Sequence, residues 1–150
     1  LPRTWGAATG LAGGGVDRIL DRFGEQPTLT VADASAPLRH AVEVRHDSFA
    51  TDSFYELCRQ FGVALVVADT AGRYTWVDQV TAELVYVRLH GDREMYRSGY
   101  SDEGIAWWAD RVRGWADTPG VTQVVVYFDN DGDAHAPHDA LRLARRLESG

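Results

Sequence analysis

Four short apolar runs share one pattern, and this pattern constrains the fold of the chain more than any other feature. Each run is rich in β-branched residues and ends abruptly in polar ones. The clearest is LVYVRLHG, residues 84–91; the others are AVEVRH (41–46), VALVVAD (63–69) and VVVYFDND (124–131). Continuous apolar runs of this length are typical of strands buried on both faces, as in parallel sheets. The pattern predicts an α/β protein with about four parallel strands.

Helical patterns separate these runs. Residues 52–61 place Phe54, Leu57, Cys58 and Phe61 on one face, and Gly62 follows as a stop signal. Ser101 is a suitable N-cap for a helix that buries Ile105, Trp108, Ala109, Val112, Trp115 and Ala116. A last helix begins near Pro137 and uses Leu143, Ala144 and Leu147, whereas 70–82 shows only weak periodicity. The predicted strands are Ala41–Arg45, Val63–Ala68, Leu84–Leu89 and Gln123–Phe128, with connections long enough for parallel crossovers.

The first 38 residues are less regular. Gly13–Gly15 predict a flexible loop, because they lack the GxGxxG spacing or GK[ST] ending of a phosphate-binding loop. A short amphipathic helix is expected over 16–23, with Gly24 at its end. The stretch LTVAD, residues 29–33, fits either a short strand or a loop.

Composition narrows the function classes. A chain of 150 residues with 45% hydrophobic content is expected to be one folded domain. Its formal net charge of −7 argues against a broad basic face for nucleic acid. All 15 basic residues are Arg, so each Arg is weaker evidence for specific recognition than usual. The single Cys58 is expected to be an inert core thiol, and no run is long enough for a membrane span. A cytoplasmic protein is predicted.

Several blocks in order resemble one family. RHAVEVRHDSF, GVALVVADTAGR, TAELVYVRLHG, MYRSGYSDEGIAWWADRVRGW and VVVYFDND…APHDALRL, spanning 39–147, are similar to the YecE-like family, the domain of unknown function 72. The resemblance implies a TIM-type (β/α)8 barrel in a family without an established activity. By fold, this family has been compared with metal-dependent enzymes of the endonuclease IV and sugar isomerase group, which is a weak indication of function.

The chain departs from the family in two respects. A complete barrel needs roughly 200 residues or more, so this chain is expected to form only the carboxyl-terminal part of one. Its open edges should then be closed by the missing amino-terminal half-barrel or by a second copy. In addition, the family usually reads FNND where this chain has Phe128, Asp129, Asn130 and Asp131. The first Asp adds a negative charge at a position that the resemblance places in the site.

The polar ends of the strands are the candidate site, because the carboxyl ends of parallel strands meet at one rim. Alternation along a strand places Glu43 with Arg45, and Arg88 with His90, on a common face. Buried charges persist only when they are paired, so the set is either a ligand site or a network of ion pairs. The gathered residues are Glu43, Arg45, His46, Asp69, Arg88, His90, Asn130 and Asp131.

An anionic ligand is the leading hypothesis. Arg45 and Arg88 can hold a phosphate or carboxylate through two hydrogen bonds each, and Arg97 is a third candidate. His46 and His90, with Asp69, are the predicted catalytic acid–base residues. The predicted ligand-binding residues are Glu43, Arg45, Arg88, Tyr100, Tyr127, Asn130 and Asp131. The ligand class is a small phosphate- or carboxylate-bearing molecule, or one nucleotide of a strand.

Two other functions stay open. Glu43, Asp69, His90 and Asp131 are suitable ligands for Mg²⁺, Mn²⁺ or Zn²⁺, which would favour a metal-dependent phosphoester hydrolase or a sugar isomerase-like enzyme. The sequence lacks HxH and HxxxH spacings and two Arg lie nearby, so no metal or other cofactor is assigned. The third possibility is a non-catalytic binding or scaffold module.

Overall fold

The structure is a computed structural model that describes residues 1–13 and 31–149. The chain divides into two compact units, Leu1–Arg39 and His40–Gly150, and each is described by itself. None of the described helices has the length and apolar composition needed to cross a membrane.

The first unit contains helix α1 (Trp5–Gly13). The hydroxyl of Thr4 accepts a hydrogen bond from the amide of Ala7 at 3.2 Å, and the amide of Gly6 donates to the carbonyl of Ala34 at 2.9 Å. A Cβ at Gly6 would lie 2.9 Å from that same carbonyl oxygen, so the close approach requires glycine. The apolar pattern did not predict this helix, because glycine is a poor helix former and the tertiary contacts of Gly6 are not visible in the pattern. The helix predicted over 16–23 lies outside the described residues, and residues 31–33 of the LTVAD stretch form no strand.

The second unit contains the parallel strands that the apolar runs predicted. They are β1 (His40–Val42), β2 (Val63–Leu65), β3 (Val67–Asp69), β4 (Leu84–Leu89) and β5 (Gln123–Phe128). β1 pairs with β2, and a second sheet has the order β3-β4-β5; every one of these pairings is parallel. The prediction of a parallel α/β fold is therefore confirmed.

The strand predicted over 63–68 is divided in two. The amide of Val66 donates to the carbonyl of Val42 at 2.9 Å, and the ladder changes partner at this point, from β1 to β4. The strand predicted over Ala41–Arg45 is shorter than expected, since β1 ends at Val42. The described strands form two open sheets, so no closed barrel is present among them.

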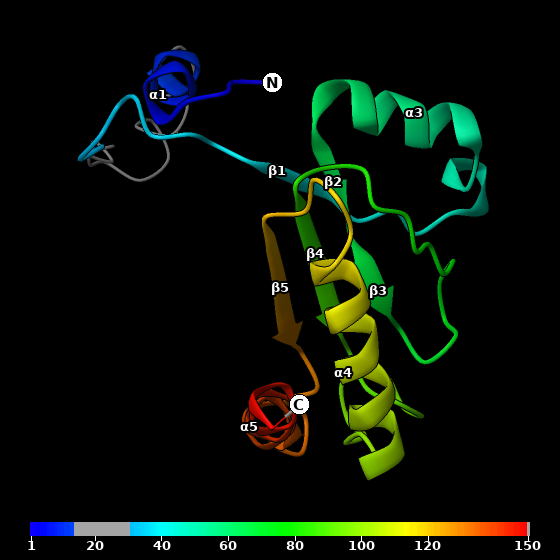
Figure 1. Ribbon diagram of the computed structural model, residues 1–150. Coiled ribbons are helices and arrows are strands. Elements are labelled where there is room, and N and C mark those ends of the chain that lie inside the picture. Colours follow the sequence, from blue (N-terminus) through cyan, green and yellow to red (C-terminus); the bar gives the residue numbers. More distant parts are fainter. Residues whose placement is uncertain (14–30, 150) are drawn as a thin grey trace, which may run out of the picture. The chain divides into compact units, whose positions relative to one another are not determined.

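The helices of this unit are η1 (Asp47–Phe49), α3 (Asp52–Phe61), α4 (Asp102–Ala116) and α5 (His135–Glu148). Figure 1 shows α4 running alongside the β3-β4-β5 sheet and α5 beyond the end of β5. As predicted, Ser101 caps α4, and Gly62 ends α3 in the left-handed conformation. Thr51, which was not predicted as a cap, caps the start of α3. The main core joins one face of the sheet to α4 and α5 through Val85, Val87, Leu89, Ile105, Trp108, Trp115 and Leu143.

Some predicted helix faces are more exposed than the patterns indicated. Leu57 and Phe61 of α3 are each 50% exposed, although Cys58 between them is buried. The small cluster under α3 is built instead from Val44, Leu65 and Val77, with Phe54 and Tyr55 packed against it. Ala116 and Ala144 are also exposed. A periodic pattern shows which residues share a face, but not how far the neighbouring sheet extends beneath it.

The connection between β3 and β4 contains no helix. It is fixed instead by polar contacts. The hydroxyl of Thr81 accepts from the amide of Leu65 at 2.9 Å and donates to the carbonyl of Val63 at 2.8 Å, while the Arg59 guanidinium donates to Gln79 at 3.0 Å. This irregular segment explains the weak periodicity that the sequence shows over 70–82.

One face of the three-stranded sheet is more exposed than the face that packs on α4 and α5 of this unit. Along β4, Val85, Val87 and Leu89 are buried, whereas Tyr86 and Arg88 on the opposite face are partly exposed. Tyr127 of β5 is 51% exposed, and its ring stacks on Tyr86 with centroids 5.3 Å apart. This face carries the charged cluster described next.

Candidate functional site

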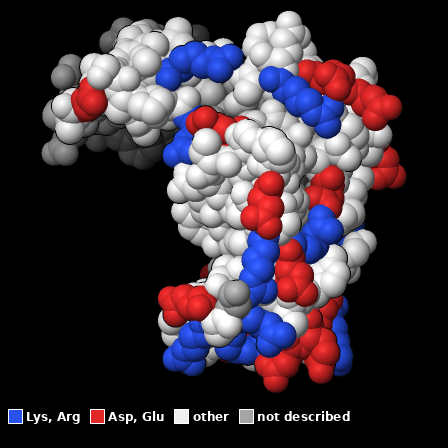
Figure 2. Space-filling model, in the orientation of Figure 1, with Lys and Arg blue, Asp and Glu red and all other residues white. Residues whose placement is uncertain are grey.

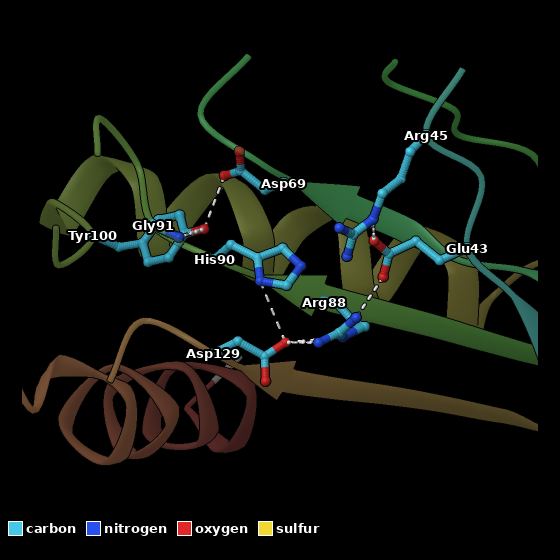
Figure 3. Close-up of polar contacts among 8 residues, drawn as sticks. All are labelled: Glu43, Arg45, Asp69, Arg88, His90, Gly91, Tyr100 and Asp129. Carbon is cyan, nitrogen blue, oxygen red and sulfur yellow. Dashed lines mark hydrogen bonds and ion pairs between the residues drawn. The ribbon is translucent and has the colours of Figure 1, made fainter. Parts of the chain in front are cut away.

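Arg88 is the centre of a chain of ion pairs at the ends of the strands. Its Nε and Nη2 atoms donate to Oδ2 of Asp129 at 2.9 and 2.8 Å, and its Nη1 donates to Oε2 of Glu43 at 2.6 Å. Burial works against the charged form of Arg88, but the contacts with Glu43 and Asp129 outweigh it and raise its pKa. Figure 3 shows this guanidinium held between two carboxylates that come from different segments of the chain.

Glu43 joins the two arginines. While Oε2 contacts Arg88, Oε1 accepts from Nε of Arg45 at 2.8 Å. Burial alone would raise the pKa of Glu43, but the hydrogen bonds from Arg88 and Arg45 lower it. The Arg45 side chain is 45% exposed, and its guanidinium lies over the ring of Tyr74, 5.0 Å from the centroid. Two guanidinium groups therefore converge on one carboxylate.

His90 lies behind these ion pairs and is fully buried. Its Nδ1 is 3.5 Å from Oδ2 of Asp129, and neither ring nitrogen has a hydrogen-bond partner among the described residues. The ring meets Tyr96 edge-on, with centroids 5.2 Å apart. Burial, followed by the charge of Arg88, lowers the pKa of His90. The imidazole is therefore neutral at neutral pH, with a nitrogen able to accept a proton or a hydrogen bond.

Asp69 and Tyr100 form a second contact on the other side of His90 (Figure 3). The hydroxyl of Tyr100 donates to Oδ2 of Asp69 at 2.9 Å and accepts from the amide of Gly91 at 3.1 Å. Burial raises the pKa of Asp69 and of Tyr100. Gly91 has a φ of +122°, and a Cβ there would lie 2.6 Å from the carbonyl oxygen of Glu94, so this turn admits only glycine.

Asn130 has a positioning role. It is fully buried, and its Nδ2 donates to the carbonyl of Ser98 at 3.0 Å and to Oδ2 of Asp139 at 2.9 Å. The same oxygen of Asp139 accepts from the amide of Tyr100 at 3.0 Å, and Arg142 pairs with Asp139 at 2.6 Å. These contacts fix the segment that carries Tyr100.

The remaining predicted residues are not members of the ion-pair chain, although Tyr127 lies beside it. His46 is exposed, and its Nδ1 lies 2.9 Å from Oγ of Ser48, where it caps η1. Asp131 is exposed in the turn after β5. Arg97 is exposed in the loop after β4, with Glu94 at 3.7 Å and Asp133 at 3.6 Å. Tyr127 is the register partner of Arg88 and lies on the same sheet face. Their roles in binding or catalysis stay predictions.

Two residues of this region were not among the predicted catalytic or ligand-binding residues, although the resemblance had placed the position of the first, Asp129, in the site. Asp129 contacts both Arg88 and His90, and its position directly after β5 was the available signal. Asp139 is 3% exposed on the buried face of α5. Asp139 lies one turn before Leu143, on the predicted core face of the last helix. A carboxylate on a core face indicates an acid that is paired inside the fold.

The four proposed metal ligands are not brought together. Within residues 1–13 and 31–149, no group of three or more His, Cys, Asp or Glu side chains is arranged to hold a metal ion. Surface charge is also mixed: on the face drawn in Figure 2, acidic and basic side chains are interspersed. The geometry supports a compact cluster of ion pairs around two arginines.

The sequence matches the model of a known protein family. Residues 16–150 match the model of a family described as "Protein of unknown function DUF72". The chain belongs to the DUF72 family. This is the same family as the YecE-like proteins, so the resemblance seen in the sequence is confirmed. No curated protein matches the sequence.

Solved structures of DUF72 family proteins are similar to this chain. One from Thermotoga maritima is 28% identical with a TM-score of 0.66, over 76% of this chain and 48% of that protein. One from Enterococcus faecalis is 23% identical with a TM-score of 0.64, over 74% of this chain and 48% of that protein. This DUF72 chain therefore spans about half the length of the structures that it matches.

Proposed function

We propose that the strand-end cluster of this DUF72 chain binds a small anionic ligand, a phosphate or carboxylate group, through Arg45 and Arg88. The observation that carries the proposal is the convergence of both guanidinium groups on Glu43, at 2.8 and 2.6 Å. Their side chains are 45% and 32% exposed, so a ligand can reach both. A guanidinium held in place by a carboxylate loses little further entropy when it binds an anion.

Donor capacity supports this assignment. A guanidinium has five N–H donors. Among the described contacts, Arg45 donates only through Nε, and its two Nη groups are directed to no acceptor. Arg88 uses one contact at each nitrogen, which leaves a hydrogen on each of Nη1 and Nη2. An anion bridging the two arginines would form charge-assisted hydrogen bonds, which are stronger than neutral ones.

The proposal also includes acid–base chemistry by His90 and Asp69. His90 is buried and neutral beside Asp129, and Asp69 is buried beside Tyr100, so both side chains can exchange a proton near a ligand held by Arg88. The wider setting we propose is the carboxyl-terminal part of a TIM-type barrel, in which such strand ends form the ligand-binding rim.

Isothermal titration calorimetry with inorganic phosphate and with sulfate tests the proposal. Arg88→Ala should weaken phosphate binding by about ten- to one-hundredfold, because a hydrogen bond to a charged group contributes about 1.5–3 kcal/mol. Arg45→Gln should weaken binding in the same direction with little effect on stability, since its side chain is well exposed. Arg145→Ala, an exposed arginine on α5, is the matched control and should bind as the unmodified chain does.

A purely structural cluster would behave differently. If these ion pairs only stabilise the fold, Arg88→Ala should lower the urea midpoint and leave phosphate affinity unchanged. In that case the unmodified chain, Arg45→Gln and Arg145→Ala should give the same weak heats with phosphate. That result would contradict the proposal and leave an ion-pair network.

A further inference from the structure

A hollow lies beside Asp69, away from the arginine pair. Its volume is about 460 Å³, and its lining includes Trp76, Trp107, Trp108, Asp69, Asp92 and Arg111. Neither Arg45 nor Arg88 lines it. Trp108 was predicted to pack in the core, and its exposure of only 3% confirms this. No role was predicted for Trp76 and Trp107, which are 46% and 48% exposed.

The three tryptophans form one aromatic cluster with rings at different angles. Trp107 and Trp108 meet edge to face at 4.8 Å and 86°. Trp76, from the irregular connection between β3 and β4, lies 6.3 Å from Trp107 and 5.9 Å from Trp108, tilted by 53° and 52°. Large apolar side chains left half-exposed in one place mark interaction sites more often than isolated ones do. Rings at different angles present aromatic surface from several directions.

The charge of the lining is acidic. Asp69 and Asp92 border the hollow. Arg111 is the one basic side chain in the lining, and its charge is balanced by an ion pair with Asp78. The guanidinium of Arg111 also lies over the rings of Trp107 and Trp115, 5.1 and 4.9 Å from their centroids. These rings therefore already hold one cation.

The nearby amino terminus of α4 does not make this acidic hollow favourable for an anion. A helix amino terminus favours anions through its unpaired amides. Here the hydroxyl of Ser101 accepts from the amide of Gly104 at 3.0 Å, and Asp102 and Glu103 occupy the first turn. These acidic side chains offset the positive end of the helix dipole, so an anion gains no clear advantage in this hollow.

We infer that this hollow binds a small organic cation, with a quaternary or alkylated ammonium group among the tryptophans and next to the two carboxyl groups. The face of an indole ring attracts a cation, and Trp is the strongest of the aromatic residues in this respect. An alkylated ammonium is weakly hydrated, so it loses less solvation on entering an aromatic site than a primary ammonium does. The inference does not use Arg45 or Arg88, and Asp69 is the one side chain that it shares with the acid–base part of the proposed anion site.

Titration of the intact chain with tetramethylammonium chloride and with choline chloride tests the inference. Binding should be saturable, and it should change the intrinsic tryptophan fluorescence at concentrations where sodium chloride has no effect. The neutral compound 3,3-dimethylbutan-1-ol has nearly the shape of choline without its charge. It should bind at least tenfold more weakly than choline if the cation is recognised.

Three variants locate the site. Trp107→Leu and Asp92→Asn should each weaken choline binding about three- to tenfold in calorimetry, the loss expected for one cation–π or charge contact. Trp5→Leu removes a tryptophan that is 47% exposed in the other unit and is the matched control, with unchanged affinity expected. Circular dichroism confirms that each variant is folded.

Several results would overturn the inference. One is the absence of saturable binding of either ammonium to the unmodified chain. Another is equal binding of choline and 3,3-dimethylbutan-1-ol, which would indicate an apolar pocket with no charge preference. Tighter binding of a neutral methyl glycoside than of choline would indicate a sugar site. Equal loss of affinity in Trp107→Leu and Trp5→Leu would place the effect outside this hollow.

Discussion

Asp129 couples the arginine pair to the buried histidine. One of its oxygens, Oδ2, lies 2.8 Å from Nη2 of Arg88 and 3.5 Å from Nδ1 of His90. Arg88 lowers the pKa of His90, and the negative charge of Asp129 raises it. The carboxylate therefore influences the protonation of His90 in a way that a neutral amide at position 129 would not.

Replacing the Asp129 carboxylate by a neutral amide should lower the pKa of His90. In Asp129→Asn, the pKa of His90 should fall further below its ordinary value of 6.5, because the main opposing charge is lost and burial and Arg88 remain. NMR titration of the imidazole resonances measures the shift. Asp133→Asn, an exposed acid in the same turn, is the control and should leave His90 unchanged. A pKa of His90 that stays constant or rises in Asp129→Asn would contradict this account of the cluster.

His90 should also make stability depend on pH. Its pKa is lowered in the folded state, so below pH 6.5 the unfolded chain takes up a proton that the folded chain does not. The free energy of unfolding should therefore decline as pH falls from 6.5 to the lower folded pKa. Urea titrations between pH 7.5 and 5 should show a flatter profile for His90→Gln than for the unmodified chain. Parallel profiles would show that His90 is not buried in its neutral form.

At the level of elements, the two faces of the sheet differ in their energetic role. Val87 of β4 is fully buried against α4, whereas Val125 on the neighbouring strand is partly exposed. Val87→Ala should lower the free energy of unfolding by about 2 kcal/mol, from two lost methyl groups and the cavity left behind. Val125→Ala should cost less than about 1 kcal/mol. Equal losses in urea unfolding would mean that both faces are buried, which would contradict the open face described above.

The sequence predicted the bounds of some elements accurately. β4, β5 and the helix Asp52–Phe61 begin and end where their apolar patterns and caps indicated. The division at Val66 could not be predicted, because side-chain pattern does not reveal which neighbour each backbone amide contacts. The convergence of Glu43, Arg45, Arg88 and His90 followed from their places at strand ends. The capping role of His46 could not be predicted in this way, because it depends on the local turn at η1.

At the scale of the whole molecule, the exposed face of the β3-β4-β5 sheet is the feature that most favours association with another polypeptide. Tyr86, Tyr127 and the partly exposed Val125 lie on the face that the helices of the second unit leave open. The β3-β4-β5 sheet also has open edges, which soluble proteins usually protect. Related solved structures are about twice as long as the matched region, since it covers 48% of them. We propose that another polypeptide, either the other half of the barrel or a second copy, covers this face.

Light scattering on the purified 150-residue chain tests this proposal. We expect self-association at micromolar concentration, reduced in Tyr127→Ser because that change removes exposed aromatic surface. Leu11→Ser, at a side chain 70% exposed in the other unit, is the control and should associate as the unmodified chain does. A chain that unfolds cooperatively and stays monomeric at all concentrations would contradict both the exposed face and the barrel setting.

The most direct test of the central claim, that Arg45 and Arg88 bind an anion together, is NMR of the arginine Nε–H groups during titration with inorganic phosphate. We expect the resonances of Arg45 and Arg88 to shift along one saturation curve, while the resonance of Arg145 on α5 does not respond. The shift should disappear for Arg45 in Arg88→Ala. Uniform small shifts across all arginines, or no shift at Arg45 and Arg88, would show that the cluster is only an ion-pair network.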